Sequence, residues 1–210
     1  RGDRCPRDFR FGAPGRLVVS RRIDFPVRRD PINLWKYRSR LVMRYIAVAE
    51  VIRDVLVTAG VPRDRITVIN SSIDLARFTD ASRLRGEARA ELGIADNEFV
   101  IGNVAALAWH KGQKDLIAAL ARIVATLPST RLVSVGAGEE GEALRLQAAA
   151  LGLEPRILFT GQRADVPRLL AAFDLFCMPS YKEGFCNAVL EAFAIGLPVV
   201  ATRAGGLPEI

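Results

Sequence analysis

From residue 98 onward, short apolar runs rich in β-branched residues alternate with amphipathic segments. The short runs predict buried strands, and apolar residues spaced three and four apart predict helices packed on one face. The predicted strands cover 99–107, 131–135, 156–160, 175–178 and 198–202, and the predicted helices cover 114–127, 140–151, 166–172 and 187–195. Because strands and helices alternate in this way in βαβ units, we predict an α/β fold with a doubly wound parallel sheet.

Residues 16–78 show the same alternation with fewer elements. Strands are predicted at 16–20, 44–48 and 66–69, with a helix over 50–59 that Gly60 ends. We interpret these elements as the last units of a different sheet. The chain is therefore predicted to hold two domains, 1–78 and 98–210, joined by a helix-prone connector at 79–97.

Charge is distributed unevenly along the chain. Residues 1–90 hold 20 of the 30 Lys and Arg residues but only 10 of the 23 Asp and Glu residues, so the net charge of +7 arises in this segment. Such a segment favours an anionic acceptor or peripheral contact with an anionic membrane, and an arginine-rich solvated surface is the plainer alternative. The arginines are not interleaved with stacking aromatic residues, which argues against a nucleic-acid partner.

No stretch of the sequence approaches the roughly 20 consecutive apolar residues of a membrane-spanning helix. Cys5, Cys177 and Cys186 form an odd set without Cys-x-x-Cys spacing, which disfavours a disulfide framework or structural zinc and suits a reducing cytoplasm. The chain begins with Arg1 and shows no apolar signal segment, so we expect a cytoplasmic protein that lacks its N-terminal part.

Two carboxylates stand where a predicted strand ends and a helix begins. Glu191 is the only charged residue between Asn187 and Val200. Leaving it buried and unpaired would cost several kcal/mol, so it needs either a protein partner or a ligand rich in hydroxyl groups. Glu183 precedes it by eight positions in a glycine-bearing turn. Open parallel sheets bind ligands at this edge, so the two glutamates mark a candidate site for a polar ligand.

A second candidate is the turn from Ala108 to Gly112, after the first strand of the second domain. An ammonium at Lys111 is well placed to bind a diphosphate and to stabilise charge on a leaving group. A solvated lysine beside a helix-capping glycine is the alternative. Gly136 and Gly138 give the backbone room to approach a ligand, although a plain turn explains them equally well.

Several of these segments together resemble a known family. They are Pro179-Ser180, Glu183-Gly184-Phe185, Asn187-Ala188, Glu191-Ala192, Gly196-Leu197-Pro198-Val199-Val200-Ala201 and Gly205-Gly206-Leu207-Pro208-Glu209. They are similar to the nucleotide-sugar half of the family-four retaining glycosyltransferases of the GT-B fold, including the Glu-seven-Glu signature. A looser match over residues 16–78 resembles the end of the family's N-terminal acceptor domain. The resemblance implies a GT-B type of fold with two Rossmann-like domains, both incomplete in this chain.

The resemblance also implies roles for the candidate residues. Glu191 would accept hydrogen bonds from the ribose, Glu183 would bind hydroxyl groups of the transferred sugar, and the backbone N–H groups of Phe185, Cys186 and Asn187 would face the diphosphate or the sugar. A buried capping or ion-pair role is the alternative for each glutamate. The expected donor is a UDP-, GDP- or ADP-linked sugar, and the expected acceptor is a glycan or a lipid-linked glycan.

Lys111-Gly112 is similar to the family's Lys-Gly, which meets the diphosphate together with an arginine on the preceding strand. Ala106 stands here in place of that arginine. Either Lys114 or Arg203 compensates for the missing cation, or stabilisation of the leaving group is weakened.

Three further expectations concern Arg163, His110 and metal ions. Arg163 follows the third strand of the second domain, where the family's main chain meets the nucleobase. His110 is the only histidine, but the family's histidine near the reacting sugar belongs to the N-terminal domain, so we do not expect it to act as a general base. The chain has no Asp-x-Asp pair for Mg²⁺, so we expect neither a metal nor a cofactor.

The sequence is compatible with three functions. The resemblance favours a retaining glycosyltransferase of envelope glycan or lipopolysaccharide synthesis, of which this chain alone is too short to be active. A GT-B-like epimerase or phosphorylase shares the architecture, but the spacing of Glu183 and Glu191 and the Lys111-Gly112 pair favour sugar transfer. The third function is a non-catalytic βαβ module that binds nucleotide sugars. Ala106 favours it, because the family's arginine is missing at this position.

Overall fold

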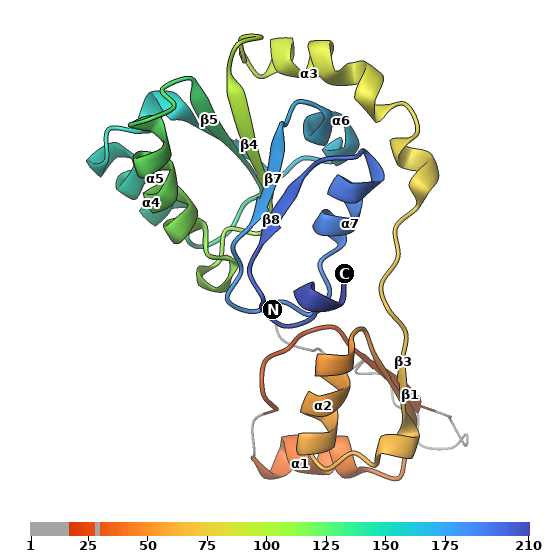
Figure 1. Cartoon of the computed structure of the whole chain (residues 1–210). Coiled ribbons are helices and arrows are strands. Elements are labelled where there is room, and N and C mark those ends of the chain that lie inside the picture. Colours follow the sequence, from red (N-terminus) through yellow and green to blue (C-terminus); the bar gives the residue numbers. More distant parts are fainter. Residues whose placement is uncertain (1–16, 28–29) are drawn as a thin grey trace.

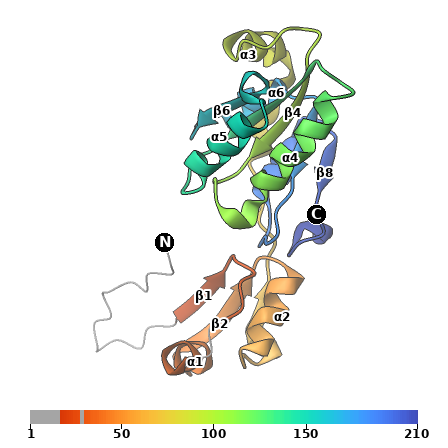
Figure 2. The same ribbon diagram turned by 90° about the vertical axis from the view of Figure 1, so that its left-hand side faces the viewer.

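The protein forms two parallel sheets in two units that meet at one boundary, and the computed structural model describes residues 17–27 and 30–210 (Figures 1 and 2). The first sheet has the order β1-β2-β3 and consists of β1 (Leu17–Arg21), β2 (Val42–Ala47) and β3 (Ile66–Val68). The second has the order β6-β5-β4-β7-β8 and consists of β4 (Phe99–Val104), β5 (Thr130–Val135), β6 (Ile157–Gly161), β7 (Leu175–Met178) and β8 (Val199–Ala201). The α/β class predicted from the sequence is confirmed.

The first unit packs α1 (Pro31–Arg38) and α2 (Glu50–Thr58) with its sheet around a core that contains Tyr45, Ile52 and Leu56. The sequence pattern did not predict α1. Its start nevertheless has a local cause, because Asp30 accepts a hydrogen bond from Asn33 N at 2.9 Å and a proline occupies the first turn.

The second unit buries its sheet on both faces. Helices α4 (Gln113–Val124) and α5 (Gly141–Ala150) cover one face, and α6 (Val166–Ala171) and α7 (Asn187–Ala194) cover the other (Figure 1). Gly102 lies in the central strand because a Cβ there would approach the ring of Phe173 to 1.8 Å. A doubly wound sheet of this kind matches the predicted architecture.

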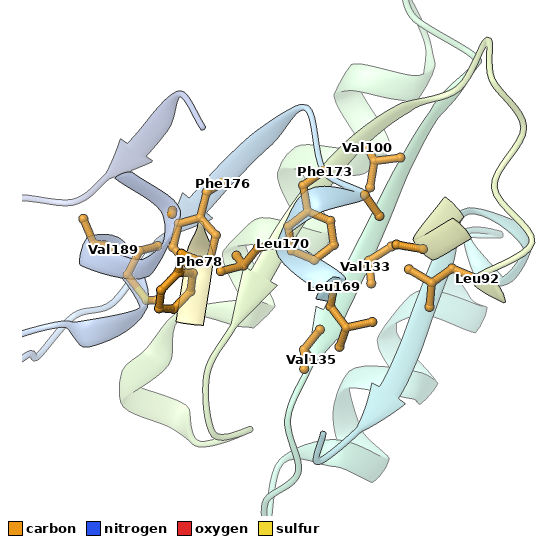
Figure 3. Close-up of a cluster of buried hydrophobic side chains, with 14 of the residues drawn as sticks. Phe78, Leu92, Val100, Val133, Val135, Leu169, Leu170, Phe173, Phe176 and Val189 are labelled. Atoms are coloured by element: carbon orange, nitrogen blue, oxygen red, sulfur yellow. The ribbon is translucent and has the colours of Figure 1, made fainter. Parts of the chain in front are cut away.

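The segment between the units packs on the second one. It contains the short 3-10 helices η2 (Leu75–Phe78) and η3 (Ala81–Leu84) and the helix α3 (Arg85–Glu91). Phe78 lies beside Phe176 and Val189, and Leu92 lies beside Val133 (Figure 3). An ion-pair network adds to this packing.

Asp174 is the centre of that network. Its carboxylate lies 2.5 Å from Arg85 and 3.3 Å from Arg89 of α3, and it accepts a hydrogen bond from Val100 N of β4 at 2.8 Å. The side chain of Arg89 is only 4% exposed and donates to three backbone carbonyls as well. Helix α3 is therefore fixed to the second sheet.

The observed elements start and end within a few residues of the predicted ones. The largest differences are three residues: β4 ends at Val104 rather than at residue 107, and α4 ends at Val124 rather than at residue 127. The partner of β4, strand β5, ends at Val135, and Gly136 then adopts a φ of 142°. Past this point, Ala105 N still donates to the Val135 carbonyl at 3.0 Å and Leu107 N to the Ala137 carbonyl at 3.1 Å. No helix in the described part of the chain is long and apolar enough to cross a membrane.

Candidate functional site

The loops that follow β4 and β7 lie next to each other at one edge of the five-stranded sheet. The chain runs outward from β4 to β5 and β6 on one side, and later to β7 and β8 on the other. The strand order thus reverses between β4 and β7. The carboxyl ends of the strands at such a point are where open α/β sheets bind ligands.

Lys111 and Glu183 meet between these two loops. The Lys111 ammonium donates to both carboxylate oxygens of Glu183, at 2.7 Å and 3.0 Å, and the hydroxyl of Ser180 donates to the same carboxylate at 3.0 Å. The Lys111 and Glu183 side chains are only 18% and 9% exposed. From the sequence, Lys111 was expected to bind the diphosphate and Glu183 the transferred sugar. In the structure the two side chains bind each other, which is the ion-pair role given above as the alternative for Glu183.

Backbone contacts hold the two loops together. The N–H groups of Tyr181 and Lys182 donate to the carbonyl of His110, at 2.8 Å and 3.4 Å. Gly112 has a φ of 71°, and a Cβ at this position would come within 2.1 Å of the Pro179 carbonyl oxygen. The glycine after Lys111 is thus required for the close approach of the loops.

Two buried amides support the loop after β4. Asn103 donates to the carbonyl of Cys177 on β7 at 2.8 Å, and Gln113 donates to the carbonyl of Ala106 at 3.0 Å. Both side chains belong to residues that are almost fully buried. Neither was predicted from the sequence, because a single amide near a strand end carries no distinctive signal. They fix the path of the chain on either side of Lys111.

Helix α7 presents an N-terminus that no side chain caps. Its N-cap residue is Cys186, and its first turn holds no acidic residue. The Oδ1 atom of Asn187 is buried without a hydrogen-bond partner in the described structure. The side chain of Phe185, just before the helix, packs against the core of the first unit. Uncapped N–H groups at a helix start suit an anionic ligand.

Glu191 lies on α7 and is half-buried. No ion pair or hydrogen bond joins its carboxylate to any residue within 17–27 and 30–210. Burial raises the pKa of Glu191, and the positive charge of Arg77 opposes that shift only in part. The sequence offered two explanations for Glu191, a protein partner or a ligand rich in hydroxyl groups. Among the described residues, no side chain forms an ion pair or hydrogen bond with its carboxylate.

Gly138 and Arg163 have structural roles of their own. A Cβ at Gly138 would lie 2.2 Å from the Leu107 carbonyl oxygen, so close packing by itself explains that glycine. The guanidinium of Arg163 is bound to Asp165 at 2.6 Å and to Glu91 at 2.7 Å. These contacts engage its side chain, whereas the part of Arg163 expected near a nucleobase is its main chain.

Ala106, which stands in place of the family's arginine, is exposed. Lys114 and Arg203 are both exposed, and neither forms an ion pair within the described residues.

Burial and the neighbouring Lys111 ammonium lower the pKa of His110. No three His, Cys, Asp or Glu side chains of residues 17–27 and 30–210 gather as metal ligands.

The first unit contacts the Glu183 loop directly. The carboxylate of Asp24 accepts a hydrogen bond from Glu183 N at 3.2 Å. A Cβ at Gly184 would lie 2.0 Å from the Arg22 carbonyl oxygen, and one at Gly205 would lie 1.7 Å from the Glu183 carbonyl oxygen. Backbones of both units therefore pack closely around the loop that carries Glu183.

Comparison with known proteins identifies the family. The family model for glycosyl transferases group 1 matches residues 85–210, which is more than half of the chain and includes both loops of the site. The chain belongs to this family. The resemblance to family-four glycosyltransferases of the GT-B type is thereby confirmed.

Two curated relatives illustrate the range of this glycosyl transferases group 1 family. The chain is 38% identical over 153 residues to D-inositol 3-phosphate glycosyltransferase of Corynebacterium jeikeium, a match that covers 68% of the chain and 36% of that protein. It is 33% identical over 192 residues to the lipopolysaccharide core biosynthesis glycosyltransferase LpsE of Rhizobium meliloti, covering 91% of the chain and 51% of LpsE. The chain thus spans from about a third to about half of the length of these relatives.

A solved structure supports the same fold. The chain matches Anabaena Alr3699/HepE, crystallised with UDP and glucose, with a TM-score of 0.83 and 33% identity over 92% of the chain and 54% of HepE. HepE thus shares the fold of most of the chain, and the GT-B fold predicted from the sequence is confirmed.

Lys111, Glu183 and Glu191 were predicted from the sequence as site residues of this group 1 family member, but the contacts around them were not. Ser180 and Asp24 both lie inside the segments that carry the family resemblance, so that resemblance was a signal for them. The bond to Asp24 was not foreseeable, because Asp24 lies 159 positions before Glu183 in the chain.

Proposed function

We propose that this chain is the donor-binding part, with an adjoining piece of the acceptor-binding part, of a glycosyltransferase. The enzyme moves a sugar from a nucleotide-diphosphate sugar to a hydroxyl acceptor with retention of anomeric configuration. The observation that carries the proposal is the pairing of Lys111 with Glu183 at the reversal point of the sheet, beside the uncapped start of α7.

The Lys111–Glu183 pair fits a site that awaits an anionic donor. When the diphosphate arrives, the Lys111 ammonium exchanges one anion for another and stabilises the negative charge that grows on the leaving phosphate. The Glu183 carboxylate is then free to accept hydrogen bonds from hydroxyl groups of the transferred sugar. Ser180 keeps Glu183 in place during this exchange, because its hydroxyl bond does not depend on Lys111.

The rest of the donor meets α7 and the neighbouring loops. The backbone N–H groups of Phe185, Cys186 and Asn187 face the diphosphate or the sugar, where the helix dipole favours negative charge. Glu191 accepts hydrogen bonds from the ribose hydroxyls, which explains a half-buried carboxylate without a described protein partner.

The edge of the site completes the donor contacts. The backbone at Gly138 and Arg163 borders the nucleotide. Lysine and helix N-terminus together neutralise the diphosphate, so the reaction needs neither a metal ion nor a cofactor.

UDP is the expected nucleotide, because HepE, at 33% identity, was crystallised with UDP. GDP- and ADP-sugars are the alternatives. The acceptor is a glycan or lipid-linked glycan of the cell envelope, in line with the lipopolysaccharide role printed for LpsE. The basic residues of the first unit favour an enzyme on the cytoplasmic side of an anionic membrane, in peripheral contact with it.

Ligand-observed NMR of the 210-residue chain tests the donor site, with UDP-, GDP- and ADP-glucose as probes. One nucleotide class should bind. Lys111→Met and Glu191→Gln should each raise its Kd by about 10- to 100-fold, the usual worth of a charged hydrogen bond. Arg122→Met and Glu142→Gln remove exposed charges elsewhere and should leave the Kd unchanged.

Lys111→Met also leaves the buried Glu183 without a counter-ion, so a loss of binding could reflect a loss of folding. The double variant Lys111→Met with Glu183→Gln removes both charges and should keep the wild-type melting temperature while still failing to bind. A folded wild-type chain that binds no nucleotide sugar would overturn the proposal. Retention itself is tested on the enzyme with both domains complete, by the anomeric proton coupling of its product.

Ala106 favours a second candidate, a non-catalytic module that binds nucleotide sugars. With one fewer cation near the diphosphate, donor binding would persist while the leaving group received less stabilisation. The variant Ala106→Arg in the enzyme with both domains complete distinguishes the two. A catalyst should gain or keep its turnover, whereas a binding module should show no turnover with or without the arginine.

A further inference from the structure

Aromatic side chains gather on the outer side of the two joined loops. The rings of Trp109 and Tyr181 lie 6.5 Å apart, centroid to centroid, and their planes are inclined by only 33°. Trp109 is 54% exposed and Tyr181 is 47% exposed. Two large rings thus present a nearly continuous apolar surface to solvent, a costly arrangement in the absence of a ligand.

Contacts with Phe25 and Asp115 hold the two exposed rings in place. Phe25 of the first unit packs edge-on against Trp109 at 6.4 Å and against His110 at 5.4 Å. The hydroxyl of Tyr181 donates to the Asp115 carboxylate at 2.8 Å. Both exposed rings are therefore positioned before any ligand arrives, which lowers the entropy cost of binding one.

The aromatic pair borders the proposed donor site. Trp109 precedes Lys111 by two residues, and Tyr181 precedes Glu183 by two residues. The backbone bond from Tyr181 N to the His110 carbonyl joins the same two loops. A group bound on the rings would therefore lie next to the Lys111–Glu183 pair and at the boundary between the two units.

Polar groups at the rim of the surface indicate the class of ligand. The Asp115 carboxylate lies beside Tyr181, and the Lys182 ammonium lies 5.3 Å from the centroid of the Phe25 ring. A wholly apolar partner would bury these charges at a cost. A pyranose ring can place its C–H face on the aromatic rings, whose faces are negative, while its hydroxyl edge reaches the charged groups.

We propose that Trp109 and Tyr181 form a stacking platform for a sugar ring of the acceptor. This inference rests on the proposed function, since it assigns the acceptor a saccharide unit beside the donor site. It adds a binding determinant supplied by the second unit, on the loops that carry Lys111 and Glu183.

Tryptophan fluorescence tests the platform directly. The chain has two tryptophans, so Trp35→Phe leaves Trp109 as the only one. Titration of this variant with maltotetraose and with cellotetraose should change the Trp109 emission in a saturable way for at least one of them, and glycerol should not. Added Tyr181→Ala should weaken that binding by about 2- to 10-fold, the usual effect of losing one stacked ring.

Two further variants separate stacking from structure. Tyr181→Phe keeps the ring but loses the Asp115 bond, so its affinity should fall between those of the wild type and Tyr181→Ala. Phe193→Ala removes a half-exposed ring from the far end of α7 and should have no effect. Circular dichroism of each variant verifies that it is folded.

The outcomes also distinguish this inference from the proposed function. The platform is overturned if neither tetrasaccharide alters the emission while UDP-glucose still binds in the NMR experiment. It is equally overturned if UDP is the only ligand that alters the emission, which would assign the rings to the nucleotide. The same holds if vesicles of anionic phospholipid are the only ligand that does so, which would assign the rings to a membrane. Saccharide binding without any nucleotide-sugar binding would sink the proposed function and leave the platform standing.

Discussion

Glu209 caps a helix of the other unit. It belongs to the last short helix of the second unit, η6 (Leu207–Glu209), and its carboxylate accepts hydrogen bonds from Glu50 N at 2.7 Å and Val51 N at 3.0 Å. These are first-turn N–H groups of α2, whose own N-cap residue, Ala49, has no side-chain acceptor. Both views show this end of the chain next to the first unit (Figures 1 and 2).

Glu209→Ala removes this cap, and its cost follows from the geometry. Loss of a helix N-cap usually costs about 0.5 to 2 kcal/mol, and a negative charge at an exposed helix start contributes about 0.3 to 1 kcal/mol. Two bonds from one exposed carboxylate support a total of about 1 to 2 kcal/mol. In a chain of this size that loss corresponds to a fall in melting temperature of about 2 to 8 °C.

Hydrogen exchange localises the effect. The amides of Glu50 and Val51 should exchange about 5- to 30-fold faster in Glu209→Ala than in the wild type, while those of α4 and α5 should not change. Glu209→Gln keeps an acceptor oxygen without the charge and should fall between the two. Glu154→Ala, an exposed glutamate elsewhere in the second unit, is the matched control. Unchanged exchange at α2 together with an unchanged melting temperature would refute the capping role.

Three further results are expected. Asp174→Ala leaves the buried Arg89 without its carboxylate and should lower the free energy of unfolding in urea by about 3 to 5 kcal/mol; a loss below about 1 kcal/mol would contradict the network. Burial raises the pKa of Glu191, so its contribution to stability is present at acid pH and is lost as the pH rises through the raised pKa. Glu191→Gln should therefore raise the melting temperature at pH 7 and lose that advantage near pH 4, and a lower melting temperature at pH 7 would contradict the burial. Burial raises the pKa of Cys177 and of Cys186 to about 11, so in a Cys5→Ser variant both thiols should react with a disulfide reagent at pH 8 far more slowly than in urea; equal rates would show that they are accessible.

The second sheet was largely predictable because its inner strands β4, β5 and β7 are mostly buried. Continuous apolar runs such as β4 and β7 are visible in the sequence without knowledge of their neighbours. Helix α1 was missed because its residues lack an amphipathic pattern, and only Asp30 and the following Pro31 indicated its start. Local patterns therefore predict the order of elements better than they predict a helix that contributes little to the core.

The site was predictable in its residue types but not in its pairings. Lys111 and Glu183 each stand after a strand, which placed both at one edge of the sheet. Their ion pair depends on which strands are neighbours, and the order β6-β5-β4-β7-β8 is not contained in any local pattern. Glu209 is a similar case, since its partner N–H groups lie 159 and 158 positions away.

Several of the contacts between the two units lie at the loop that carries Glu183. Asp24 accepts a hydrogen bond from the backbone of that residue. A Cβ at Gly184 would lie 2.0 Å from the Arg22 carbonyl oxygen, and one at Gly206 would lie 3.0 Å from the Ala49 Cβ. A relative movement of the units would therefore alter the backbone at Glu183 before it altered the far faces of either sheet. Because Glu183 in turn holds Lys111, the position of the ammonium depends on how the units meet, although both residues of the pair belong to the second unit.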